Sequence, residues 1–205
     1  MALSGSDDDD ENKKINIRDV ENFRRYEPFF KAVFHGEWNT AQTFLDQHPE
    51  AVRARAPYSG KTALHIAISR GHLHIAEKLV ELMAEQDLEI KGMEDGLTPL
   101  GAAVEVGSLA MAKCLINKNK RLASIPYRPR GLPARHALLC GQDQMARYLY
   151  SVTPIKDLMR LEGLRHHCAV LLSECIRTKN FGTTLLLTFN VSLARNTSFW
   201  PKGKK

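Results

Sequence analysis

The sequence predicts an all-α fold, an α-solenoid in which short helix-turn-helix units repeat and stack. The first observation is a spacing of 34 to 36 residues between four glycines: Gly36, Gly71, Gly107 and Gly141. The second is that an alanine recurs five residues after each glycine: Ala41, Ala76, Ala112 and Ala146. Each unit has apolar surface that only a neighbouring unit can cover, so the units are expected to stack.

The first helix of each unit is expected to begin at a defined residue. Thr62 and Thr98 lie where an N-cap hydroxyl accepts a hydrogen bond from the free amides of the first turn. Pro99 follows at the first helical position, where its missing N–H costs nothing. The residues expected to face the core from these two helices are Leu64, Ala67, Leu100 and Ala103.

Three of the repeated glycines are expected to end the first helix. Gly71, Gly107 and Gly141 can adopt the left-handed conformation that closes a helix and that other residues adopt at a cost. A second helix then returns antiparallel and carries one leucine inward in each unit: Leu79, Leu115 and Leu149. The predicted units cover residues 27–59, 60–95, 96–130 and 131–153.

The chain as a whole is expected to divide into four segments. Residues 1–22 are polar and strongly acidic, with Asp7 to Asp10 in sequence, and are expected to be a disordered tail. Residues 23–153 hold the four repeats. Residues 154–195 are expected to form a degenerate further repeat, and residues 196–205 a disordered basic tail.

The fourth unit departs from the pattern. The run from Gly131 to Gly141 is one residue shorter than its counterparts, and Pro133 is expected to replace the capping threonine. In the third unit Gly101 stands where the second unit has His65. The hydrogen bonds between these units are therefore expected to differ from those made by the second unit.

Two motifs invite a catalytic or ligand-binding interpretation. Gly60-Lys61-Thr62 resembles the end of a phosphate-binding loop, but Arg55 stands where the first glycine is required. His72 and His74 lie two residues apart on a predicted helix, so they point to different faces and cannot share a metal ion with His65. The sequence predicts no catalytic residue, no cofactor and no metal site, and therefore no enzyme.

The net charge of +6 is unevenly distributed. Residues 1–117 hold 13 basic and 19 acidic residues, a net charge of −6, whereas residues 118–205 hold 16 basic and 4 acidic residues, a net charge of +12. Such a basic half attracts nucleic acid, acidic lipid or an acidic protein. Binding of nucleic acid or acidic lipid is therefore an alternative function, although no nucleic-acid recognition motif accompanies the charge.

Cysteine usage and hydropathy indicate the compartment. The four cysteines form no CxxC pair, which favours buried free thiols in a reducing environment. No apolar signal segment follows Met1, and the apolar run at residues 183–193 is shorter than the roughly 18 residues of a membrane helix. A cytoplasmic location is expected, with the inner face of the plasma membrane as an alternative.

The repeated motifs resemble the ankyrin repeat, which opens with Gly-x-Thr-Pro-Leu-His and continues with alanines and a glycine. The second unit carries the matching residues Gly60, Thr62, Leu64, His65, Ala67, Gly71 and His72. The third carries Gly96, Thr98, Pro99, Leu100, Ala102, Ala103 and Gly107. The resemblance implies that His65 ties neighbouring repeats together by hydrogen bonds, and that the chain binds other proteins.

A more detailed resemblance covers residues 26–195. The segment 29–53, the run Tyr148 to Pro154 and the segment 168–195 are similar to a plant family of ankyrin proteins, of the accelerated-cell-death and increased-salt-tolerance type. Its members carry a C-terminal membrane domain of several helices and are implicated in defence and salt-stress signalling. That domain is absent from this sequence, which is interpreted as a truncated form.

Exposed loop tips between the repeats are the predicted partner-binding sites. In ankyrin stacks such tips and the inner helix faces form the binding surface, so the resemblance points to seven residues: Tyr58, Ser59, Met93, Glu94, Tyr127, Arg128 and Arg130. An aromatic ring beside arginines can hold carboxylates or another aromatic face. The predicted function is a non-enzymatic scaffold for an unidentified protein partner.

Overall fold

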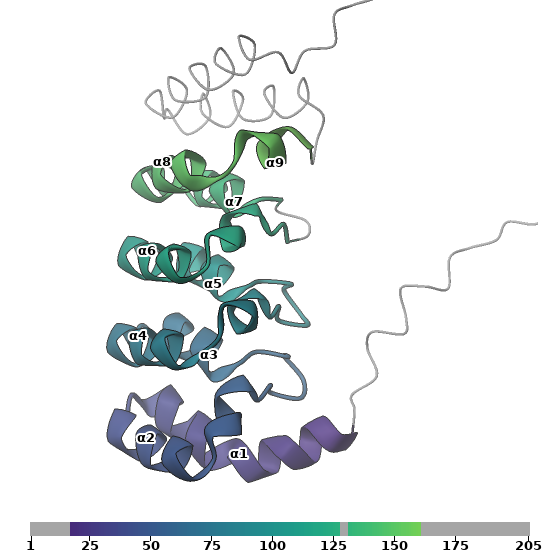
Figure 1. Ribbon diagram of the computed structural model, residues 1–205, viewed down its shortest axis with the longest axis vertical. Coiled ribbons are helices and arrows are strands. Elements are labelled where there is room, and N and C mark those ends of the chain that lie inside the picture. The colour runs from purple at the N-terminus through teal and green to yellow at the C-terminus, as the bar shows by residue number, and fades with distance from the viewer. Residues whose placement is uncertain (1–16, 128–130, 161–205) are drawn as a thin grey trace, which may run out of the picture.

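The computed structural model describes residues 17–127 and 131–160, and this part of the chain is an all-helical stack of helix pairs (Figure 1). The first helices of the pairs are α1 (Ile17–His35), α3 (Ala63–Ser69), α5 (Pro99–Glu105) and α7 (Pro133–Leu139). The second helices are α2 (Trp38–Gln47), α4 (Leu73–Leu82), α6 (Leu109–Lys118) and α8 (Asp143–Val152). The predicted all-α solenoid of helix-turn-helix units is confirmed.

Short helices follow the second helix of each pair and lead to the loops between repeats. They are η3 (Pro49–Arg53), η4 (Glu85–Glu89), η5 (Lys120–Ser124) and α9 (Ile155–Arg160). The loops that follow η3 and η4 project to the same side of the stack, away from the second helices (Figure 1). The fold therefore presents two different long faces, one with loop tips and one built from α2, α4, α6 and α8.

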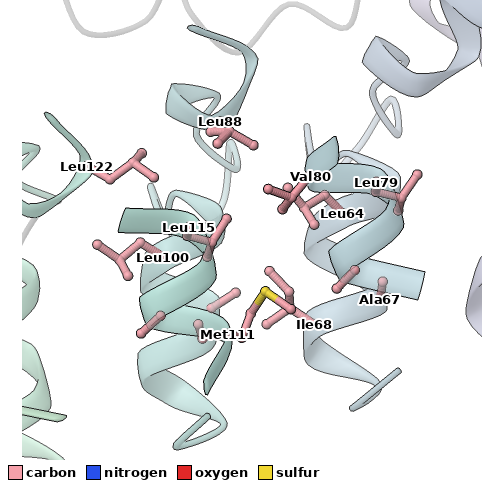
Figure 2. Close-up of a cluster of buried hydrophobic side chains, with 14 of the residues drawn as sticks. Leu64, Ala67, Ile68, Leu79, Val80, Leu88, Leu100, Met111, Leu115 and Leu122 are labelled. Atoms are coloured by element: carbon pink, nitrogen blue, oxygen red, sulfur yellow. The ribbon is translucent and has the colours of Figure 1, made fainter. Parts of the chain in front are cut away.

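The core runs without interruption from one repeat to the next. Figure 2 shows the interface between the second and third repeats. Leu64, Ile68 and Val80 of the second repeat lie on one side of it, and on the other side lie Leu100, Met111 and Leu115 of the third. Each of these side chains is buried, as are the other predicted core residues Ala67, Leu79, Ala103 and Leu149. A buried leucine or isoleucine contributes roughly 1.5–3 kcal/mol to folding, so the repeats stabilise one another through these contacts.

The repeated glycines end the first helices as predicted. Gly71, Gly107 and Gly141 have φ angles of 77°, 73° and 71°, in the left-handed region. At the first of these turns the amide of His72 donates to the carbonyl of Ala67 (2.9 Å), and the Gly71 amide donates to the carbonyl of Ile68 (3.0 Å). This hydrogen-bond pair is the Schellman closure, which reverses the chain into the second helix.

Helix α1 begins earlier than the sequence predicts. It starts at Ile17, so the last six residues of the expected disordered tail 1–22 are helical. It also runs through Pro28, which aligns with Pro99 and Pro133, the residues at which α5 and α7 begin. The extension is anchored at Tyr26, whose buried ring lies against Phe44 and whose hydroxyl donates to Glu50 (3.0 Å). These contacts form only in the folded stack.

The fourth repeat is shortened in its loop and not in its helix. Helix α7 has the same length as α3 and α5, and Leu132 is its N-cap residue. The expectation that Pro133 replaces the threonine is therefore wrong, because Pro133 occupies the first helical position. The loop closes instead by two hydrogen bonds between Tyr127 and Gly131, of 3.0 and 2.9 Å. A single glycine thus closes a loop that needs both Gly60 and Lys61 in the second repeat.

A tyrosine occupies the space left by the missing histidine of the third repeat. A Cβ atom on Gly101 would lie 2.9 Å from Leu97 Cδ2 and 3.3 Å from Cε1 of Tyr127. The Tyr127 ring is buried, and its hydroxyl lies 3.0 Å from Nδ1 of His136, within hydrogen-bond distance. The third and fourth repeats are therefore joined by a side-chain link that differs from the one made by His65.

A double-mutant cycle tests whether the Tyr127 ring fills the space that a histidine side chain at position 101 would occupy. Gly101→His should cost about 1–3 kcal/mol of unfolding free energy, because the imidazole and the Tyr127 ring compete for one space. Tyr127→Ala should cost about 3–5 kcal/mol through the cavity it leaves. The double variant should lose less unfolding free energy than the two single variants lose together, and the difference should be about 1 kcal/mol or more in urea unfolding. Gly101→His combined with the distant Leu45→Ala should be additive, and additivity in both pairs would contradict the shared space.

Candidate partner-binding surface

The loop tips of the first two inter-repeat loops are exposed and adjacent. Tyr58 is 71% exposed and Met93 is 43% exposed, and Glu94 is exposed beside it, whereas Ser59 is half-buried. The Met93 amide donates a hydrogen bond of 2.7 Å to the carbonyl of Ser59, which joins one tip to the next. An aromatic ring and a thioether side chain are thus held at neighbouring positions on the surface.

Long basic side chains fix the bases of these loops. Arg55 donates from Nε to the carbonyl of Gly60 (3.1 Å) and from Nη2 to the carbonyl of Lys91 (2.8 Å). One repeat later, Nζ of Lys91 donates to the carbonyl of Pro126 (2.8 Å). The same contact therefore recurs between successive loops and sets their spacing.

An ion pair also connects the first two loops. Nζ of Lys61 lies 2.8 Å from a carboxylate oxygen of Asp95. Partial burial raises the pKa of Asp95, but hydrogen bonds from Lys61 and from the Leu97 amide outweigh it, so the pKa lies below its ordinary value. Both charges are compensated, which leaves Glu94 as the exposed carboxylate of the second tip.

The third predicted tip is placed differently from the other two. Tyr127 is only 2% exposed and lies at the base of its loop, in the position that Ala56 and Gly92 occupy in the preceding loops. The expectation of an exposed ring between arginines is therefore corrected, because packing over Gly101 draws the ring into the stack. Arg128 and Arg130 lie outside the described residues.

His65 is a structural residue, as the motif implies. Its Nδ1 accepts from the Thr62 amide (3.2 Å) and lies 2.9 Å from the Thr62 hydroxyl, while Nε2 lies 3.2 Å from the carbonyl of Leu97 in the next repeat. These partners require a proton on Nε2 and none on Nδ1. Burial lowers the pKa of His65 to about 4, so the imidazole is neutral at physiological pH.

The other two histidines of the motif do not converge with it. Nε2 of His72 lies 3.0 Å from the carbonyl of Phe34 in the first repeat, whereas His74 is exposed on α4. Gln142 takes the place of His72 in the fourth repeat and donates to the carbonyl of Val104 (2.6 Å). Within residues 17–127 and 131–160, no group of three or more His, Cys, Asp or Glu side chains is arranged to hold a metal ion.

The two described cysteines differ from the expectation of burial. Cys114 is half-buried, and burial raises the pKa of its thiol. Cys140 is exposed, because it follows Leu139 at the end of α7, where the chain turns outward. Cys168 and Cys175 lie outside the described residues.

The fold and its hydrogen bonds define a class of protein built from stacked helical repeats joined by projecting loops. Residues 29–80 match the family model of ankyrin repeats (many copies), so this segment is similar to ankyrin repeats. Synphilin-1 from Mus musculus is 33% identical to it over 67 residues, which are 33% of this chain and 7% of synphilin-1. The match thus spans a small part of that relative. No helix in the described ranges is long and apolar enough to cross a membrane.

The low pKa of His65 predicts how stability depends on pH. The unfolded histidine binds a proton near pH 6.5, whereas the folded one resists protonation until about pH 4. The contribution of His65 to the free energy of unfolding is therefore fully present above about pH 6.5. It is lost progressively between pH 6.5 and 4, by about 3 kcal/mol in all. Urea unfolding at pH 7.5 and pH 5 should show this loss.

The matched variant is His65→Gln, which keeps a polar side chain but cannot titrate. It should be less stable at pH 7.5, and its stability should change less between the two pH values than that of the unchanged protein. Equal changes in the two proteins would mean that other groups account for the pH dependence.

Proposed function

We propose that this protein is a non-enzymatic scaffold that binds a protein partner through the tips of its first two inter-repeat loops. The observation that carries the proposal is the exposed pair Tyr58 and Met93 on adjacent, hydrogen-bonded tips. Tyrosine is enriched among the residues that dominate binding energy at interfaces, and methionine adapts to irregular surfaces. Glu94 adds one exposed carboxylate, which favours a partner with a basic residue beside its apolar anchor.

The rigidity of the tips supports the same function. Because Arg55 and Lys91 each bond to the following loop, little conformational entropy remains to be lost when a partner binds. Ankyrin repeats are typically non-catalytic, and the match at residues 29–80 is to that family. Binding is therefore the activity to test before turnover.

We further propose that the binding serves stress or defence signalling in a plant cell. This rests on the resemblance of residues 26–195 to the plant family that carries a membrane domain. A cytoplasmic location at the inner face of the plasma membrane belongs to the same proposal. The basic segment 118–205 keeps acidic lipid and nucleic acid as alternative ligands, whose binding would weaken steeply with added salt.

Site-specific crosslinking tests the loop-tip surface. A photo-crosslinking amino acid at position 58 should capture a protein partner from cell extract, because that side chain would lie inside the interface. The same group at Ala110, exposed on α6, should not capture it. Capture of the same protein from both positions would contradict a localised surface.

The captured partner then allows affinities to be measured. Tyr58→Ala and Met93→Ala should each raise its Kd by about tenfold or more, since exposed anchor residues carry most of the binding energy. Leu73→Ala, a partly exposed leucine on α4, is the matched control and should leave the Kd unchanged. Unchanged affinity in both tip variants would overturn the proposal.

A further inference from the structure

A groove of about 620 Å³ lies on the face opposite the loop tips, between α2 and α4. Helix α2 provides one side, the C-terminal half of α4 the other, and η3 closes one end. The side chains that line it are Trp38, Gln42, Leu45, Asp46, Pro49, Val52, Lys78, Glu81 and Leu82. Its lining combines apolar side chains with three charged groups.

The apolar residues of this groove exceed what the fold requires. Leu82 is 58% exposed at the last position of α4. The adjacent helices α2 and α6 end in the polar Gln47 and Lys118, whereas α8 ends in Val152, so the repeat accepts a polar residue at this place and does not require a leucine. Leu82 continues an apolar surface that includes Trp38 and Val52, and a contiguous exposed surface of this kind marks a site that another molecule can cover.

The short helix η3 also differs from η4 and η5 in how far an apolar side chain is buried. Val52 of η3 is half-buried, whereas its counterparts Leu88 of η4 and Ala123 of η5 are fully buried. The gap between α2 and α4 thus leaves uncovered a side chain whose equivalents belong to the core in later repeats. The groove is a feature of the junction between the first and second repeats.

The charges around the groove favour a basic partner. Lys78 lies 3.3 Å from Oε2 of Glu81, so these two charges compensate one another. In the described part of the chain Asp46 forms no ion pair, which leaves one carboxylate available at the edge. A cation placed beside Asp46 would therefore be attracted.

We propose that this groove binds an amphipathic helix of a partner protein, with aliphatic residues spaced at i and i+3 or i+4 and a lysine or arginine beside them. The aliphatic side chains would lie against Trp38, Val52 and Leu82, as helices bind in apolar grooves elsewhere. The basic side chain would reach Asp46. This surface is independent of the loop tips, so one protein could bind at each face.

The test uses a phage-displayed library of random 16-residue peptides selected against the full chain. Selected peptides should be basic and show the apolar spacing of an amphipathic helix. Leu82→Gln should weaken their binding by about tenfold or more through loss of the apolar contact. Asp46→Asn should weaken it by about two- to fivefold, as expected for an exposed ion pair.

Two controls keep the result specific to the groove. Leu73→Gln and Glu77→Gln change a leucine and a carboxylate of α4 that lie outside the groove, and they should leave peptide binding unchanged. Urea unfolding should show that Leu82→Gln is folded, as the glutamine at the end of α2 suggests.

Three results would overturn the proposal. The first is selection of peptides whose binding is insensitive to Leu82→Gln. The second is selection of acidic or uncharged peptides, which would remove the charge argument. The third is self-association of the full chain in sedimentation experiments that Leu82→Gln abolishes, because the occupant would then be a second copy.

Discussion

No single helix pair of this protein can cover its own apolar surface, and the rest of the structure depends on that constraint. The pair α3–α4 buries Leu64 and Leu79 because α1 lies against it on one side and α5 and α6 lie against it on the other. Stability is thus a property of neighbouring repeats together, and each interface contributes to holding the next. The loops inherit their positions from this packing, so a binding surface on their tips is set by the core beneath it.

Polar contacts give the stack its register, whereas apolar contacts give it its stability. Arg55, His65 and Lys91 each reach a carbonyl about one repeat along the chain. Their residue types are not invariant from repeat to repeat. Gln142 makes the contact of His72, and Tyr127 with His136 replaces the contact of His65. What recurs is a donor of suitable length at a given position.

The sequence predicted the parts of the fold that repeat. Thr98, the glycine turns and the inward leucines follow local rules that a 35-residue period makes visible, and Thr98 does accept from the Gly101 amide (3.3 Å). The start of α1 could not be predicted, because its anchoring contact between Tyr26 and Glu50 joins residues far apart in the sequence. The burial of Tyr127 was missed for a similar reason. Its position beside arginines indicated a loop tip, but the absence of a side chain at Gly101 provides the space for its ring.

The groove between α2 and α4 was also absent from the sequence analysis. Leu82 continues an ordinary amphipathic pattern, and only its exposure in the assembled stack distinguishes it from a core leucine. The signal that could have found it is the comparison of equivalent positions, since Gln47 and Lys118 end the neighbouring helices. Alignment within the chain therefore carries information about function where repeats differ, and about fold where they agree.

The passage of α1 through Pro28 has a consequence for how the chain can be cut. Proline has no N–H, so the helical hydrogen bond to the carbonyl of Arg24 is missing and the two halves of α1 are less strongly coupled. Tyr26, two residues before Pro28, stays packed together with Phe29 and Val33, so only the turns before Tyr26 can open. The weaker coupling at Pro28 therefore affects the first turns of α1, and a shorter form of the stack has to retain Tyr26.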